Sequence, residues 1–267
     1  MLSRIPILVL CVLISFLAHA QPSEKYATLP AGNNVLYQIT TVRAAPGQLQ
    51  FLLEAYQALA AGDYYSNAGL NPPFIIRHSQ GDHWDLMLVS PLISFSNYYA
   101  PEHVRKRHIA QDQHANQLNA INDIIAFNED HFMHGPPLTV LTKEFLNNTF
   151  AHIEIFHAIA GKKAELIHQR IIENQYLEGV ERKANQIFVT QTGGDADVMT
   201  IGFYPSLQIF AAPQTIAPKQ RDKVAKQVGF KDLDDISYYL RSLISSHHDS
   251  LANIVTFTLA ETNTTGQ

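Results

Sequence analysis

The sequence is poor in cysteine and in charge. One of its 267 residues is cysteine, 16% are charged, and the formal net charge is −5. A nucleic-acid-binding protein needs a basic surface to neutralise phosphates, so this balance argues against nucleic acid as a partner. The motifs H-E-x-x-H and G-x-S-x-G are absent, and so is any cysteine–histidine cluster. No standard catalytic or zinc-binding signature therefore assigns an activity.

Long apolar runs are also missing, except at the N-terminus. Residues 5–17 are almost continuously apolar after Arg4, and Ala18-His19-Ala20 fits an A-x-A cleavage site. The run is too short for a stable membrane span. We expect residues 1–20 to be a signal peptide, and the mature chain to be periplasmic or secreted, without a stable membrane span. Cys11 would leave with this segment, which excludes disulfides from the mature chain.

The remaining sequence contains two copies of one pattern. The first copy predicts a strand, a helix and two strands, at residues 34–43, 48–61, 74–79 and 84–90. The second copy predicts the same order, at residues 150–158, 162–177, 186–191 and 197–204. VRAAPG at 42–47 aligns with FHAIAG at 156–161, and DLMLVSP at 85–91 aligns with MTIGFYP at 199–205. Because few residues are identical between the two copies, the evidence for the repeat is the shared order of strands and helices.

Each copy continues with helical sequence and a closing strand. The helical segments are predicted at residues 101–127, 219–228 and 236–245, and the closing strands at residues 138–145 and 253–259. The unit is therefore β-α-β-β-α-β. We place the two units at residues 34–147 and 148–262.

This pattern resembles the dimeric α/β-barrel superfamily of ferredoxin-like domains, and its halves look most like NIPSNAP-type and related stress-barrel domains. The resemblance implies an α+β fold in which tandem ferredoxin-like units form an intramolecular α/β barrel. A homodimer is allowed but not required, because the barrel is completed within one chain. Members of the superfamily include cofactor-free monooxygenases, haem-binding enzymes and domains without known activity, so the fold does not choose the function.

The strand at 150–158 supplies the best candidate site residues. Alternation places His152 and Glu154 on one face, and Ile153 and Ile155 on the other. We expect the isoleucines to pack on helices, so that His152 and Glu154 point into the barrel as candidate catalytic residues.

The same alternation predicts further residues that line a ligand pocket. These are Gln38, Thr40, Thr200, Gly202, Tyr204 and Thr256. Gly202 would leave room for a closely approaching ligand. Gln38 and Thr40 align with His152 and Glu154 but are neutral, so we expect only the second half to be active.

A histidine-rich corner, His247-His248-Asp249, precedes the predicted last strand. If it converges with His152 and Glu154, the site could bind zinc, iron or copper, or transfer protons near neutral pH. The alternative is that His152 and Glu154 satisfy each other in a polar cavity and that the corner only ends a helix. Asp130-His131-x-x-His134 is a second metal candidate, predicted to lie in a turn.

Three classes of function stay open. We expect an exported barrel that binds a small, partly apolar molecule. The alternative is a monooxygenase-like or metal- or haem-dependent enzyme that uses His152 and Glu154. The third is an interaction protein whose barrel is plain core. A cavity surrounded by converging polar groups would favour either of the first two, and a large exposed apolar patch the third.

Overall fold

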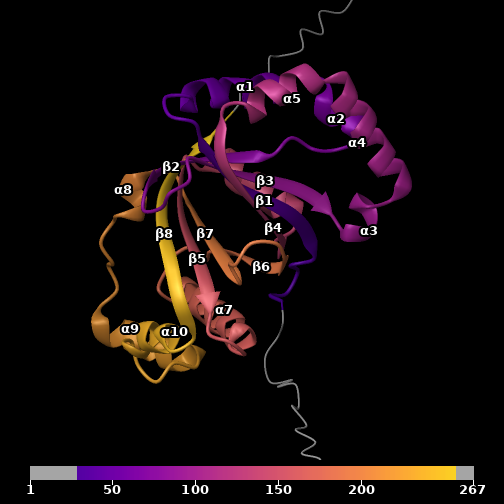
Figure 1. Cartoon of the computed structure of the whole chain (residues 1–267). Helices are drawn as coiled ribbons and strands as arrows, with labels where there is room; N and C mark the ends of the chain where they lie inside the picture. Colours follow the sequence, from indigo (N-terminus) through magenta and orange to yellow (C-terminus); the bar gives the residue numbers. More distant parts are fainter. Residues whose placement is uncertain (1–28, 257–267) are drawn as a thin grey trace, which may run out of the picture.

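The computed structural model describes residues 29–256, so the predicted signal peptide at residues 1–20 lies outside the described part (Figure 1). The first half contains β1 (Val35–Ala44), α1 (Leu49–Ala61), α2 (Tyr64–Ala68), β2 (Phe74–Gln80), β3 (Leu86–Ile93), α3 (Phe95–Tyr98), α4 (Pro101–Gln113), α5 (Ala115–Asn122), β4 (Ile125–Gly135) and α6 (Leu138–Asn147). The second half contains β5 (Phe150–Ala158), α7 (Lys163–Gly179), β6 (Gln186–Thr192), β7 (Val198–Tyr204), α8 (Leu207–Phe210), α9 (Pro218–Val228), α10 (Asp235–Arg241) and β8 (Ile244–Val255).

The strands close into one barrel in the order β1-β3-β2-β8-β5-β7-β6-β4, and all neighbours are antiparallel. Each half contributes four strands, and the halves meet where β2 pairs with β8 and β4 pairs with β6. The predicted α+β fold, with tandem ferredoxin-like units in one intramolecular barrel, is therefore confirmed. The division at residues 147 and 148 stays a prediction.

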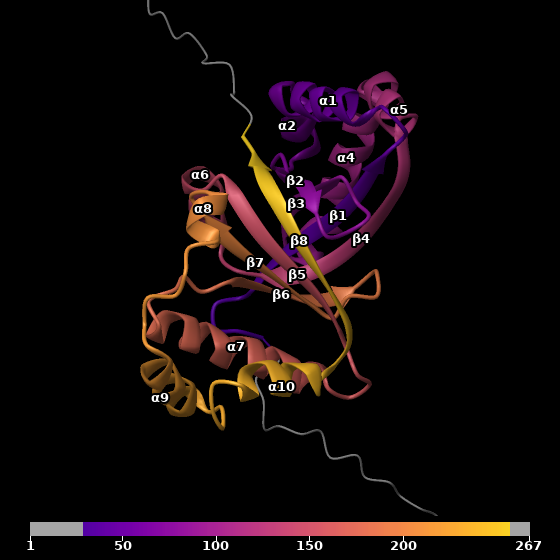
Figure 2. The same cartoon turned by 90° about the vertical axis from the view of Figure 1, so that its left-hand side faces the viewer.

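Helices cover the outside of the barrel on two opposite sides. Figure 2 shows α1, α2, α4 and α5 gathered on one side, and α7, α9 and α10 on the other. Helix α1 buries Leu52, Tyr56 and Leu59, which helical spacing places on one face, against the outer surface of β1 and β3. Helix α7 packs Leu166 and Ile167 in the same way against Phe156 of β5.

The repeat is visible in equivalent hydrogen bonds. The backbone N–H of Ala44 donates to Asp85 Oδ2 over 2.8 Å, and that of Ala158 donates to Asp197 Oδ2 over 2.9 Å. These contacts place Asp85 over Asp197, so the predicted alignment of residue 85 with residue 199 is wrong by two positions. The face of each strand residue was unaffected by this error because a strand repeats every two residues.

The interior of the barrel is filled by one large apolar cluster. All eight strands contribute to it, with Tyr37, Ile39, Ile76, Val89, Met133, Ile153, Phe188, Ile201 and Ala252 among its members. Three further apolar clusters of the described residues lie outside the barrel: one under α1, one under α7, and one between α7 and α9.

The predicted closing strand at residues 138–145 is wrong, because this segment forms α6. Leu138, Leu141 and Phe145 are three and four residues apart, which is helical spacing. They join the interior cluster, where the Phe145 ring lies 4.5 Å from that of Phe74 and 5.0 Å from that of Phe203. Since α6 connects the end of β4 to the start of β5, it covers that end of the barrel.

The true closing strands start earlier than predicted. β4 occupies residues 125–135, and β8 begins at Ile244 instead of residue 253. The helix predicted at 236–245 ends at Arg241, so His247, His248 and Asp249 lie within β8. The predicted strand at 253–259 extends beyond the described residues. Among residues 29–256, no helix is both long and apolar enough to cross a membrane.

Candidate functional site

The two faces of β5 are the reverse of the prediction. Ile153 is fully buried in the interior cluster, whereas Phe156 packs outside against α7. His152 and Glu154 share the face of Phe156 and therefore point away from the barrel interior. The physical reason is that the barrel interior is the larger dry core and takes the branched apolar residues. The helix-covered face leaves gaps in which polar side chains find partners on α7.

The predicted pocket-lining residues follow the same reversal. Thr200 Oγ1 donates to Glu154 Oε2 over 2.9 Å, and the Tyr204 ring packs on Phe210, both on the outer face. These residues lie outside the barrel or past its strands: Gln38, Thr40, Thr200, Gly202, Tyr204 and Thr256. Gly202 leaves no free space, because a Cβ there would lie 2.6 Å from the Asn185 side chain. None of the six lines the barrel cavity described below.

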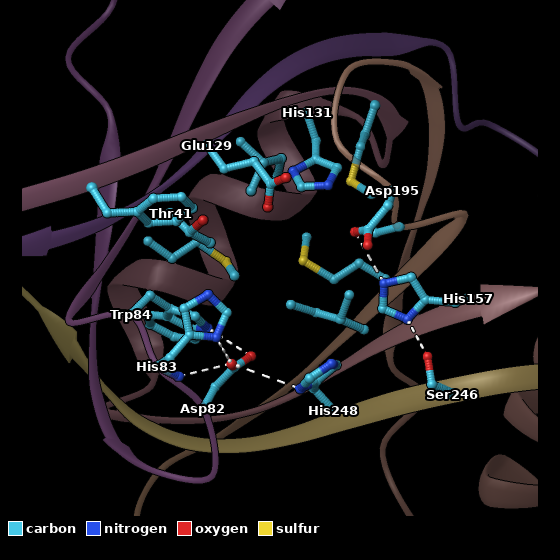
Figure 3. Close-up of a pocket in the computed structure, with 17 residues that line it drawn as sticks. Thr41, Asp82, His83, Trp84, Glu129, His131, His157, Asp195, Ser246 and His248 are labelled. Atoms are coloured by element: carbon cyan, nitrogen blue, oxygen red, sulfur yellow. Dashed lines mark hydrogen bonds and ion pairs between the residues drawn. The ribbon is translucent and has the colours of Figure 1, made fainter.

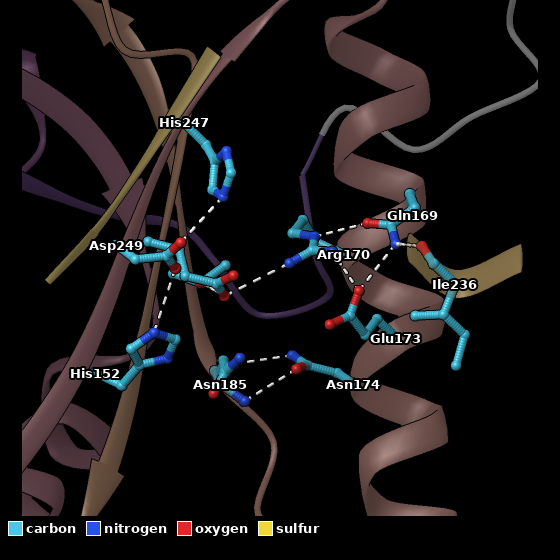
Figure 4. Close-up of polar contacts among 11 residues, drawn as sticks. His152, Gln169, Arg170, Glu173, Asn174, Asn185, Ile236, His247 and Asp249 are labelled. Carbon is cyan, nitrogen blue, oxygen red and sulfur yellow. Dashed lines mark hydrogen bonds and ion pairs between the residues drawn. The ribbon is translucent and has the colours of Figure 1, made fainter. Parts of the chain in front are cut away.

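The outer face nevertheless brings several predicted site residues together (Figure 4). Asp249 Oδ1 lies 3.3 Å from His152 Nε2, and its Oδ2 lies 3.0 Å from His247 Nε2. The hydrogen bond from His152 lowers the pKa of Asp249, and partial burial opposes this shift. Glu154, His247 and Asp249 line a pocket of about 550 Å³ between the sheet and helices α7 and α10, and His152 joins this group through its contact with Asp249.

Arg170 of α7 anchors this outer cluster. Its side chain is 2% exposed, its Nη1 lies 3.6 Å from Glu154 Oε2, and its Nη2 donates to Glu173. Burial raises the pKa of Glu173, and the guanidinium of Arg170 opposes that shift. His152 and Glu154 thus satisfy other partners and not each other, which differs from both interpretations of the sequence.

The predicted metal triple of His247, His248 and Asp249 is wrong. Consecutive residues of β8 alternate between faces, so His248 points into the barrel while its two neighbours point out. His248 Nδ1 lies 3.7 Å from Asp82 Oδ1, on the inner side. One ion could not contact all three side chains.

A cavity of about 320 Å³ opens at the end of the barrel opposite α6 (Figure 3). Its apolar wall includes Met87, Met133 and Met199, together with Ile39 and Ile155. The sequence contains four methionines, so all of them except Met1 line this cavity. Methionine side chains are flexible and polarisable, and they adapt to ligands of different shape.

One side of the cavity rim is organised around Asp82. Its carboxylate is only 4% exposed and accepts a hydrogen bond from Trp84 Nε1 over 3.0 Å. His83 Nδ1 lies 2.7 Å from the same carboxylate. These residues come from the loop between β2 and β3, so the first half contributes to the cavity as much as the second.

The other side of the rim carries Glu129, His131, His157 and Asp195. His157 Nε2 lies 3.1 Å from Asp195 Oδ1, and its Nδ1 lies 3.0 Å from Ser246 Oγ. Glu129 and His131 are inward-facing residues of β4. Burial lowers the pKa of His131, so its imidazole is neutral at pH 7.

These rim residues were missed because β4 was predicted as the end of a helix followed by a turn. In a strand, the alternation Glu129-Asp130-His131 turns Glu129 and His131 inward and Asp130 outward. His134 also points outward, so the predicted Asp130-His131-x-x-His134 site does not form. Recognising that strand would have identified the site.

Glycines allow the loop between β6 and β7 to cover His131. Gly194 has a φ of +46°, and a Cβ at this position would lie 1.8 Å from His131 Nε2. The first half repeats the arrangement, since a Cβ on Gly81 would lie 1.8 Å from the carbonyl oxygen of Asp249. Both loops therefore approach a neighbouring strand at a distance that only glycine permits.

Comparisons with known proteins support the fold. No protein-family model matches the sequence, and no curated protein matches it. Among solved structures, an anthrone oxidase-like protein superposes with a TM-score of 0.54 at 12% identity, over 84% of this chain and 92% of that one. A mutant chlorite dismutase from Candidatus Nitrospira defluvii has a TM-score of 0.46 at 11% identity, over 88% of this chain and 95% of that one. The match to the anthrone oxidase-like protein supports the fold alone, and at this identity the likeness extends no further.

Proposed function

We propose that this chain binds a small, partly apolar molecule in the open end of its barrel. The observation that carries the proposal is a single cavity in which three methionines face a rim of histidines and carboxylates. Its volume of about 320 Å³ lies at the lower end of the range for small-molecule sites, roughly 300–1,000 Å³. The apolar part of the ligand would contact the methionines, and its polar part would reach the rim.

The charges of the rim narrow the class of ligand. The described cavity lining contains three carboxylates, Asp82, Glu129 and Asp195, but no lysine or arginine. A bound anion would face these carboxylates without a permanent positive charge to balance them. A neutral or cationic molecule with hydrogen-bond donors fits the rim better.

Isothermal titration calorimetry of the chelator-treated chain with indole and indole-3-carboxylate tests this proposal, because the two probes share an aromatic body and differ in charge. We expect indole to bind and the carboxylate to bind at least tenfold more weakly. Ile155→Trp, which adds volume at the half-buried edge of the cavity, should abolish indole binding. His152→Ala, on the opposite face of the same strand, should leave it unchanged. Equal binding of both probes, or indole binding that survives Ile155→Trp, would rule out the proposed site.

We also propose that the protein is exported after removal of residues 1–20 and acts in the periplasm or outside the cell. The support for this is the sequence pattern of the segment. The closer resemblance to NIPSNAP-type domains stays a proposal too, supported by the shared order of elements. A second copy of the chain is not needed to complete the barrel, so a homodimer would have to form through another surface.

An enzymatic alternative belongs to the outer pocket. Asp249 contacts both His152 and His247, and Glu154 lines the same pocket, so proton transfer is the chemistry these side chains favour. A haem does not fit there, because Glu154, Glu173, Asp234 and Asp249 line the pocket and would oppose its propionates. If this alternative holds, His152→Ala removes an activity that Ile155→Trp leaves intact. An activity that is lost in Ile155→Trp and retained in His152→Ala would contradict it.

A further inference from the structure

Three side chains that belong to the classes of metal ligand meet on one side of the barrel cavity. Glu129 and His131 project inward from alternate positions of β4, and Asp195 comes from the loop between β6 and β7. One carboxylate oxygen from each acid and one ring nitrogen of His131 all lie within 4.8 Å of one another. Among residues 29–256 this is the only such group of three. Figure 3 shows Glu129 beside His131, with Asp195 facing them.

His131 offers a buried ring nitrogen without a partner. Its side chain is 6% exposed, and its Nε2 has no hydrogen-bond partner among the described residues. A buried imidazole nitrogen without a partner costs free energy, which a bound ion would offset.

Asp195 is oriented by a neighbour that leaves it free to act as a ligand. His157 Nε2 lies 3.1 Å from Oδ1 of Asp195. Ser246 holds the other ring nitrogen of His157 at 3.0 Å. The Asp195 side chain is 82% exposed, so small movements are open to it. Such histidine–carboxylate support is typical of the residues around bound metals.

The carboxylates of Glu129 and Asp195 also favour the binding of a cation. Neither Glu129 nor Asp195 forms an ion pair with lysine or arginine in the described part of the chain. The two carboxylates lie beside the apolar wall of the cavity. Without a counter-ion the two carboxylates would repel each other.

From these observations we infer that Glu129, His131 and Asp195 bind a divalent first-row transition-metal ion, such as Zn²⁺, inside the barrel cavity. Zinc bonds of about 2.1 Å place the ligand atoms of a tetrahedral site roughly 3.4 Å apart. Ligand atoms that now lie up to 4.8 Å apart would therefore move closer on binding, which the exposure of Asp195 permits. Three protein ligands leave a coordination position open toward the cavity, as in catalytic zinc sites.

The test uses the full chain, expressed without a polyhistidine tag, stripped with a chelator and titrated with Zn²⁺ by calorimetry. We expect one ion per chain. Glu129→Gln and Asp195→Asn nearly preserve side-chain shape, and each should weaken binding at least tenfold. Asp195→Asn changes an exposed loop residue, so the variant should remain folded; circular dichroism checks this.

Two matched variants separate this site from the other histidines. His248→Ala changes a histidine of the same cavity, and His152→Ala changes the outer cluster. Both should bind Zn²⁺ as the unmodified chain does. Less than half an equivalent of ion in the unmodified chain overturns the inference, and so does unchanged binding in Glu129→Gln and Asp195→Asn. Because indole binding is read separately, failure of this site does not imply failure of the proposed ligand site.

Discussion

His152 and Ile153 are neighbours in β5 with opposite surroundings: Ile153 is 0% exposed inside the barrel, whereas His152 lies 3.3 Å from Asp249 on the outer face. The barrel interior is thus formed by residues, such as Ile153, that the sequence pattern predicted to pack against helices. This arrangement predicts that the two positions differ sharply in their contribution to stability.

Ile153→Ala should destabilise the protein by about 2–5 kcal/mol, because it opens a space in a packed core that cannot fully collapse. His152→Ala should cost about 1 kcal/mol or less, since its partner Asp249 is half exposed. Urea unfolding followed by circular dichroism measures both values. Similar losses in the two variants would mean that the faces of β5 are assigned wrongly.

We predict that removing the charge of Arg170 strongly lowers the free energy of unfolding. Arg170→Met leaves Glu173, whose side chain is only 21% exposed, without its cation, and we expect a loss of about 3 kcal/mol, at the lower end of the range for a broken buried pair. The control is Lys226→Met, which removes a surface pair with Asp222 and should leave the free energy of unfolding nearly unchanged. The double variant Arg170→Met, Glu173→Met should recover much of the loss. If it is no more stable than Arg170→Met alone, the unpaired charge is not the cause.

Alanine substitutions at Gly161 and Gly194 distinguish the cost of backbone strain from the cost of steric overlap. Both have positive φ, but a Cβ on Gly161 meets nothing within 4 Å, whereas one on Gly194 meets the His131 ring. Gly161→Ala should therefore cost only the left-handed backbone penalty, about 1–2 kcal/mol. Gly194→Ala should cost a further ~1–3 kcal/mol, because His131 must move. Thermal unfolding of the two variants gives the comparison, and equal midpoints would show that the loop does not press on His131.

We predict that protonation of Asp249 accounts for part of the stability that the protein loses at low pH. Its folded-state pKa lies below the ordinary value of 3.8, chiefly because of the hydrogen bond from His152. The unfolded chain therefore binds this proton at higher pH than the folded one does. The resulting stabilisation is present above pH 3.8 and is lost as the pH falls through the lower, folded-state pKa.

With the carboxylate 52% exposed, this contribution should be about 0.5 kcal/mol. Asp249→Asn should lose that stability at pH 7 and differ little from the unmodified chain at pH 2–3, as measured by urea unfolding across this range. A difference that grows toward low pH would have the wrong sign and would reject the assignment.

The sequence was sufficient for the fold because the repeat is encoded in the order of strands, helices and turns. Asp85 and Asp197 show why, since both loops keep the same carboxylate for the same backbone contact. Alternation also placed His152 with Glu154 and Thr200 with Tyr204 correctly on shared faces. It could not say which face is the interior, because a barrel strand packed under helices is largely apolar on both sides.

The candidate site was harder to predict than the fold. The sequence predicts a helix up to residue 127 and a turn after it, whereas Glu129 and His131 lie in β4. Asp195 meets them only because β6 pairs with β4, a long-range contact that joins the two halves. Local pattern in one half carries no information about that pairing.

Methyl NMR of the methionines tests the central claim most directly. Met87, Met133 and Met199 line the cavity, and Met1 lies in the predicted signal peptide, so each methyl signal of the mature chain reports on the cavity. On titration with indole we predict that the three signals shift together and saturate, and that Ile155→Trp removes the shifts. Indole binding that leaves all three signals unmoved would show that the ligand site lies elsewhere.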